Sequence, residues 1–269
     1  MNYLLFLILF VIIPLIINII IFISVLPLRE LNDQRYFPSL QRIGFFIFLL
    51  AIIAVIYTTP WDNYLVASEV WGYDPDKILG IIIGYVPFEE YMFFILQTFL
   101  IGLTFILIYR QFFGKVSDDR ELLTKRGRKN LVVILPVLSI WIISLITFIL
   151  QIESLNYLNL ILLWALPPLS VQLLFGADIL WEIKIPVSLT IGLGTIYFAI
   201  TDAIAIQDGI WEISPFQTTN ILLGGILPIE EFTFFLVTNI LITFGLSLLI
   251  SQRSYERITR IQNWIKTRS

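Results

Sequence analysis

Seven apolar stretches, each long enough to cross a lipid bilayer, constrain this chain more than any other feature. A transmembrane helix needs roughly 20 mostly apolar residues, and 58% of the 269 residues are hydrophobic while only 14% are charged. The pattern predicts an all-α membrane protein with about seven transmembrane helices. Two of the stretches exceed a single crossing, the third and the seventh, so we expect those helices to be tilted or broken. The stretches cover residues 3–26, 41–59, 78–109, 131–150, 156–175, 186–206 and 218–250.

The distribution of lysine and arginine predicts the orientation. Cytoplasmic loops carry an excess of these residues, and of the 17 in the chain only Lys77 falls on the opposite side from the others. We therefore expect a multi-pass protein of the cell membrane with its N-terminus outside and its C-terminus in the cytoplasm. The first stretch has no basic residue before it and no cleavage site after it, so we interpret it as a helix and not as a signal peptide. The predicted cytoplasmic residues are Arg29, Arg35, Arg42, Arg110, Lys115, Arg120, Lys125, Arg126, Arg128, Lys129, Lys184, Arg253, Arg257, Arg260, Lys266 and Arg268.

Two segments of the chain resemble each other. Residues 57–62 and 84–94 contain Trp61-Asp62 and a Pro-x-Glu-Glu-x-x-Phe-Phe motif, and residues 197–202 and 225–235 contain Thr201-Asp202 and the same motif. The spacing from Asp62 to Glu89 is 27 residues, and that from Asp202 to Glu230 is 28. This agreement predicts an internal duplication.

The duplication divides the chain into four parts. Residues 1–112 form a first repeat of three helices, and residues 156–250 form a second. Residues 113–155 hold a basic cytoplasmic loop and a linking helix, which makes the two repeats parallel because one extra crossing restores the orientation. Residues 251–269 form a basic tail with apolar residues at helical spacing, expected either as an amphipathic helix on the inner membrane surface or as a frayed polar end.

Four acidic residues lie inside apolar stretches, where charge is costly and usually functional. They are Glu89 and Glu90 in the first repeat and Glu230 and Glu231 in the second, each about ten residues into its stretch and therefore predicted near the middle of the membrane. Proline precedes each pair at a position that favours the start of a new helix. The pairs are candidate catalytic residues, because two carboxyls held close can share a proton. The alternative is a structural hydrogen-bonding role.

Other candidate site residues surround these acids. Asp62 and Asp202 are predicted at the outer ends of their helices, where they either contact a substrate or lie in the headgroup zone. Aromatic side chains follow each glutamate pair, and their π faces can stabilise a carbocation as they stabilise other cations; packing is the alternative. The candidate substrate-binding residues are Asp62, Asp202, Trp61, Phe93, Phe94, Phe234 and Phe235.

The doubled motif resembles that of the small membrane-integral lycopene cyclases of bacteria, archaea and fungi, in a form with both halves fused in one chain. Both copies keep the proline and both glutamates, while the residue after the proline is Phe88 or Ile229 and Thr201 replaces the tryptophan at Trp61. The resemblance implies acid-catalysed closure of the ends of a linear carotenoid into β-ionone rings, giving γ- or β-carotene. Glu89 and Glu230 are then expected as primary acid and base, with Glu90 and Glu231 orienting them or sharing the proton.

The resemblance also implies that no cofactor takes part. The sequence has no nucleotide-binding glycine motif, so we predict no flavin, and without cysteine or histidine we predict no metal site. The expected partners are lycopene or a similar linear carotenoid and membrane lipid, with association with other carotenoid enzymes left open and no nucleic acid.

Other functions remain open at this point. Intramembrane acids in repeated bundles also mark proton-coupled transporters, although few other polar residues line such a path here. A terpenoid cyclase acting on another polyene would use the same chemistry. A retinal-type receptor needs a lysine inside a helix, and a glutamate protease needs histidine and a nearby arginine, which the motifs lack.

Overall fold

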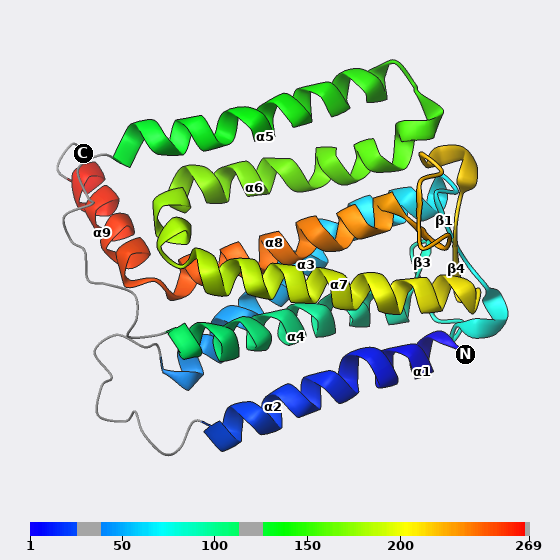
Figure 1. The fold of residues 1–269 in the computed structure, drawn as a ribbon, viewed down its shortest axis with the longest axis horizontal. Helices are drawn as coiled ribbons and strands as arrows, with labels where there is room; N and C mark the ends of the chain where they lie inside the picture. Colours follow the sequence, from blue (N-terminus) through cyan, green and yellow to red (C-terminus); the bar gives the residue numbers. More distant parts are fainter. Residues whose placement is uncertain (26–38, 113–125, 267–269) are drawn as a thin grey trace.

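The computed structural model describes residues 1–25, 39–112 and 126–266. Its long helices lie side by side with their axes roughly aligned (Figure 1). Within the described ranges, six helices are long and apolar enough to cross a membrane: Tyr3–Ser24, Leu40–Ala67, Phe88–Phe112, Glu153–Glu182, Lys184–Gln207 and Ile229–Ile250. Large aliphatic side chains on their outer faces are exposed, as expected next to lipid; Ile56, for example, is 70% exposed. The protein is an all-α membrane protein.

The helices follow the predicted apolar stretches with shifted ends. The first span consists of α1 (Tyr3–Leu7), a π-helical segment (Ile8–Ile12) and α2 (Ile13–Val25). The others are α3 (Leu40–Ala67), α4 (Phe88–Phe112), α5 (Arg126–Ile149), α6 (Asn156–Glu182), α7 (Lys184–Gln207), α8 (Ile229–Ile250) and α9 (Gln252–Lys266). Several basic residues behind the predicted orientation lie outside the described residues, namely Arg29, Arg35, Lys115, Arg120, Lys125 and Arg268.

The two longest predicted stretches begin with a β-hairpin. In one, β2 (Ile82–Ile83) pairs with β3 (Val86–Pro87) before α4. In the other, β5 (Leu222–Leu223) pairs with β6 (Leu227–Pro228) before α8. Glycines in the turns, such as Gly84 with φ of 70°, adopt the left-handed backbone that glycine tolerates without steric cost. The extra length is therefore a hairpin followed by one uninterrupted helix, and not a broken helix.

This arrangement corrects the predicted depth of the glutamate pairs. They lie in the first turn of α4 and of α8, as the preceding prolines predict. Each of these helices is long enough by itself to cross the hydrocarbon core. The pairs therefore lie near one end of a span, and the prediction that they lie at its middle is wrong.

The same order of elements occurs twice along the chain. A helix, a short strand, a 3₁₀ turn, a hairpin and a second helix run from α3 to α4 and again from α7 to α8. The short strands are β1 (Trp71–Tyr73) and β4 (Trp211–Ile213), which pair antiparallel with Trp71 opposite Ile213 and Tyr73 opposite Trp211. The strand of one half therefore lies directly beside the corresponding strand of the other, at the end of the molecule that carries the N-terminus (Figure 1).

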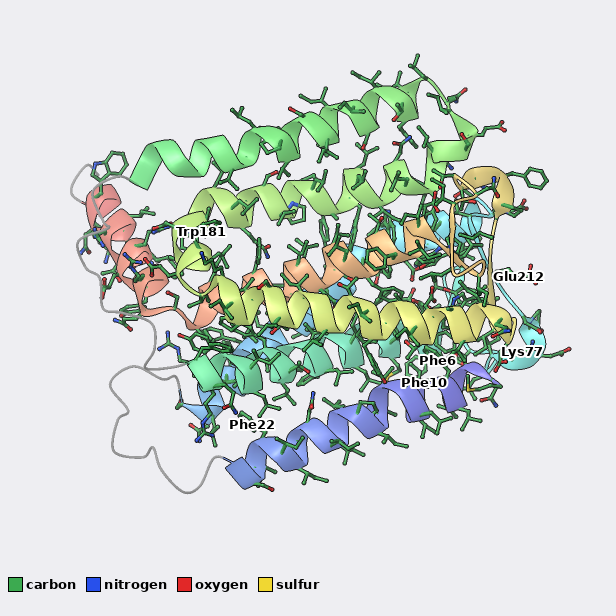
Figure 2. All side chains as sticks on the ribbon, in the orientation of Figure 1. Phe6, Phe10, Phe22, Lys77, Trp181 and Glu212 are labelled. Carbon is green, nitrogen blue, oxygen red and sulfur yellow. The ribbon has the colours of Figure 1, made fainter. Side chains whose placement is uncertain are left out.

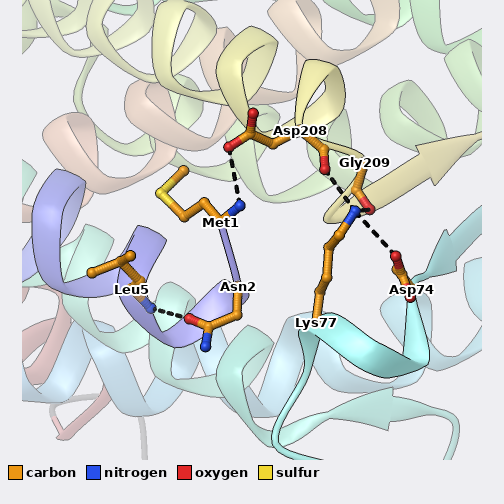
Figure 3. A network of polar contacts seen from close by, with 7 residues as sticks. All are labelled: Met1, Asn2, Leu5, Asp74, Lys77, Asp208 and Gly209. Atoms are coloured by element: carbon orange, nitrogen blue, oxygen red, sulfur yellow. Dashed lines mark hydrogen bonds and ion pairs between the residues drawn. The ribbon is translucent and has the colours of Figure 1, made fainter.

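Two reciprocal contacts hold the loops of the halves together. The Nζ of Lys77 donates to the backbone carbonyls of Asp208 at 2.7 Å and Gly209 at 3.1 Å (Figure 3). At the position corresponding to Lys77, the Nε2 of Gln217 donates to the carbonyl of Ser68 at 3.0 Å. The amino group of Met1 lies 3.4 Å from Oδ2 of Asp208, so the first helix is attached to the same cluster.

Lys77 also pairs with Asp74 across 3.1 Å. The backbone N–H of Asp76 and, next, the side chain of Lys77 hold the pKa of Asp74 below its usual value. The stabilisation of the folded state that goes with this lowered pKa is fully present at neutral pH. It is lost as the pH falls through the pKa that Asp74 has in the folded protein.

The linking helix and the tail lie at the periphery. α5 packs along α6 on the outside of the bundle (Figure 1), and the described part of its apolar stretch runs over Val133–Ile149. α9 packs on α6 and α8, where Arg253 pairs with Glu182 and Nη2 of Arg257 lies 2.7 Å from Oδ2 of Asp178. Lys77 and Glu212 mark one end of the molecule, whereas Trp181 and Phe22 lie near the other (Figure 2).

We predict that Lys77→Met destabilises the protein by about 1–2 kcal/mol, because the change removes a charged donor from two carbonyls. Thermal unfolding of the purified protein in detergent measures the effect. The exposed Asp76 provides the control, because Asp76→Asn keeps the backbone N–H that Asp74 accepts. Equal unfolding temperatures for Lys77→Met and the unaltered protein would show that the contact between the loops contributes nothing.

Candidate active site

The first glutamate of each pair fastens the loop before its helix. Oε1 of Glu89 accepts the backbone N–H of Leu79 at 2.5 Å, and Oε1 of Glu230 accepts that of Thr219 at 2.7 Å. Both side chains are at most 1% exposed. A carboxylate in the first turn of a helix is favoured by the helix dipole, and here it also fixes the path of the preceding segment.

The second glutamate of each pair is held by tyrosine hydroxyls. Oε2 of Glu90 accepts from the hydroxyls of Tyr3 at 2.6 Å and Tyr73 at 3.1 Å. Oε1 of Glu231 accepts from the hydroxyl of Tyr157 at 2.7 Å. Burial is the main cause, and the neighbouring Glu90 the second, of a pKa of Tyr73 well above its usual value. The hydroxyl therefore stays protonated and donates.

A small cavity of about 30 Å³ brings the two halves together at this point. Its acidic residues are Glu90, Glu231 and Asp202, and the remaining wall is almost entirely aromatic. Glu89 and Glu230 are not part of the wall. The other residues that line it are Tyr3, Phe6, Trp71, Tyr73, Phe93, Thr201, Trp211, Ile213, Phe234 and Phe235.

Asp202 and Asp62 occupy corresponding positions but have different surroundings. Oδ1 of Asp202 accepts from Nε1 of Trp211 at 2.9 Å, and its side chain lines the cavity. Asp62 is fully buried and does not line the cavity, and neither of its carboxyl oxygens has a hydrogen-bond partner. Because α3 and α7 continue beyond these residues, neither is the exposed helix-end residue of the headgroup alternative.

The candidate aromatic residues divide in the same way. Phe93, Phe234 and Phe235 line the cavity, whereas Phe94 is buried and does not. The ring of Trp61 stacks on that of Trp164 at 4.7 Å, and its Nε1 donates to the carbonyl of Leu160 at 3.0 Å. Trp61 is therefore a packing residue in this structure.

The tyrosines that hold the acids were not predicted from the sequence. A signal for two of them exists, because Asn2-Tyr3-Leu4 recurs as Asn156-Tyr157-Leu158 at the start of the first helix of each half. This motif is short and lies far from the acidic motif along the chain. Only the fold places Tyr3 and Tyr157 against the second glutamate of each pair.

Comparison with known proteins decides the family. The family model described as lycopene cyclase matches residues 34–112 and 154–249, which is more than half of the chain. The chain belongs to the lycopene cyclase family. The match includes both glutamate pairs and Tyr157 but excludes the first helix with Tyr3.

Named relatives agree with this assignment. The chain is 34% identical over 201 residues to a lycopene beta-cyclase of Halobacterium salinarum, covering 74% of this chain and 80% of the relative. It is 33% identical over 232 residues to a bifunctional lycopene cyclase/phytoene synthase of Podospora anserina, covering 83% of this chain and 38% of the relative. The chain therefore spans less than half the length of that fungal relative. No solved structure matches.

We predict that Tyr3→Phe and Tyr157→Phe each destabilise the protein by about 1–3 kcal/mol, because each leaves a buried carboxyl oxygen with one donor fewer. Glu90 keeps Tyr73 as a donor, so the effect of Tyr3→Phe is the smaller of the two. Thermal unfolding in detergent measures both. Tyr85→Phe is the matched control, because Tyr85 is 63% exposed; if all three variants unfold alike, the hydroxyls do not support the acids.

Proposed function

We propose that this protein is a lycopene β-cyclase that closes the linear ends of lycopene into β-ionone rings without a cofactor. The observation that carries the proposal is the meeting of Glu90 and Glu231, one from each half, on the wall of a single aromatic cavity. Membership of the lycopene cyclase family supports this function over a proton-coupled carrier.

The proposed reaction is an isomerisation in which no atom is gained or lost. A protonated carboxyl gives its proton to the terminal double bond and forms a tertiary carbocation. The electron pair of a neighbouring double bond then attacks the cation, and the new carbon–carbon bond closes a six-membered ring. A carboxylate removes a ring proton, which leaves the ring double bond and restores the proton balance of the site.

The surroundings of the acids suit this chemistry. Alkene protonation needs an acid in a site from which water is excluded, since water would capture the cation. Phe93, Phe234 and Phe235 present aromatic rings at the cavity, and such rings stabilise cationic charge. The substrate is a hydrocarbon that dissolves in the bilayer around the helices.

We assign the proton transfers to Glu90 and Glu231, which line the cavity and are held by tyrosines. Glu89 and Glu230 keep the hairpin loops in place through backbone N–H groups. This exchanges the roles expected from the sequence. Since the cavity of about 30 Å³ is too small for a six-membered ring, its side chains move apart when the end group enters.

The proposal includes the arrangement in the membrane. The chain makes seven crossings, α5 being the linking one, and residues 1–112 and 156–250 form parallel repeats related by an axis along the membrane normal. The repeated order of elements and the pairing of β1 with β4 support this arrangement. The N-terminus and the cavity then lie toward the outer face, and α9 lies along the inner one.

We predict that Glu90→Gln and Glu231→Gln lower the conversion of lycopene by roughly 100-fold or more, because general acid–base catalysis contributes at least that much. The protein is expressed in lycopene-accumulating cells and the pigments are separated by chromatography. Glu89→Gln and Glu230→Gln are the matched neighbours; a glutamine carbonyl still accepts the backbone N–H, so their loss is smaller. The reverse ranking would overturn the role assignment, and unchanged lycopene with the unaltered protein would overturn the proposed substrate.

To test the topology, reporters are fused to either end of the chain. We expect a reporter that works only in the cytoplasm to be active when it is fused after Ser269. We expect a reporter that works only on the external side of the membrane to be active when it is fused before Met1. Both fusions are scored beside pigment conversion, so that a misinserted protein is recognised. A C-terminus that reads out as external would contradict the proposed orientation.

A further inference from the structure

Helix packing creates two corresponding acid clusters, each built from both halves. The hydroxyl of Tyr197 on α7 donates to the carbonyl of Phe10 in the first helix at 2.7 Å. The hydroxyl of Tyr57, at the corresponding place on α3, donates to the carbonyl of Trp164 on α6 at 2.9 Å. Each of these two helices therefore packs against the leading helix of the other half.

The first cluster, which we call the Asp202 cluster, consists of Asp202, Thr201, Tyr3 and Phe6. The second, the Asp62 cluster, consists of Asp62 and Trp61 on α3 with Leu160 on α6, whose carbonyl accepts from Nε1 of Trp61 at 3.0 Å. Glu90, Glu231 and the paired strands β1 and β4 lie between them. Every residue of the Asp202 cluster lines the cavity, and no residue of the Asp62 cluster does.

One pair of corresponding residues next to the two aspartates differs strongly in size. Where α7 carries Thr201, α3 carries Trp61, whose ring contacts those of Trp71 at 5.6 Å, Trp164 at 4.7 Å and Phe234 at 5.6 Å. The indole is only 9% exposed and fills the space between these three rings. Thr201 is too small to reach across the corresponding space, and the cavity opens there.

We infer that the substrate end group binds only at the Asp202 cluster, and that Thr201 and Trp61 determine this choice. The inference rests on the proposed cyclase function. Asp202 contacts the end group beside Glu231, with one oxygen held by Trp211 and the other, Oδ2, buried without a partner. Asp62 is fully buried, does not line the cavity and does not reach the substrate.

The first test compares the two aspartates, since Asp→Asn keeps the side-chain size at both positions. We expect Asp202→Asn to lower lycopene conversion roughly 100-fold, the scale of a misplaced substrate, and Asp62→Asn to lower it far less. Conversion is normalised to the amount of protein in the membrane. Equal losses, or a larger loss for Asp62→Asn, would overturn the inference while leaving the cyclase proposal intact. Failure of the unaltered protein to convert lycopene would instead reject the proposed function.

The second test transposes the two side chains. Thr201→Trp is expected to abolish conversion by filling the cavity, whereas Thr201→Val, which keeps the volume, is expected to retain it. In the double variant Trp61→Thr/Thr201→Trp, activity is expected to return and to depend on Asp62 in place of Asp202. Activity of Thr201→Trp equal to that of Thr201→Val would overturn the inference. So would a double variant that is folded by thermal unfolding and active, and yet still depends on Asp202.

Discussion

Burial of four carboxyl groups at the start of two membrane helices is the constraint on which the rest of the structure depends. Such groups are tolerated in a low-dielectric interior only when other groups satisfy them. The chain meets this requirement at one oxygen of each carboxyl, with backbone N–H groups for Glu89 and Glu230 and with tyrosine hydroxyls for Glu90 and Glu231. The second oxygen, Oε2, of Glu89 and of Glu230 is buried without a partner. The hairpins before α4 and α8 and the tyrosines at the start of α1 and α6 are thus parts of one solution. The proposed chemistry uses the acids that the tyrosines hold at the cavity.

The two halves contact each other extensively at the end of the molecule where the cavity lies. β1 pairs with β4, the Lys77 and Gln217 contacts cross between loops, and α3 and α7 each pack against the leading helix of the opposite half. This reciprocity is what brings Glu90 and Glu231 to the same space. It also allows corresponding positions to differ in role, because each lies against a different set of neighbours. Trp61 and Thr201 are the clearest case.

Much of the fold was predictable because hydrophobic length is a strong signal in a membrane protein. The helical class and the helix starts after the two prolines followed from the sequence. The hairpins were not predicted, since residues 78–87 are as apolar as the helix they precede. The division of labour within each glutamate pair was not predictable either, because it depends on Leu79, Thr219, Tyr3 and Tyr157, which reach the acids only through the fold. Spacing shows which residues are repeated and says nothing about which of them face a cavity.

The peripheral position of α5 has a consequence for how the chain is connected. This helix packs mainly on α6, and none of its described residues lines the cavity. The covalent connection between the halves therefore serves to supply them in equal number and in the same orientation. Two separately translated halves carrying the same surfaces would meet the same geometric demands, provided that they recognise each other and not themselves. Trp61 on α3 and Thr201 on α7 differ in size. A complex of two unlike halves therefore has a shape that a complex of two identical halves would lack.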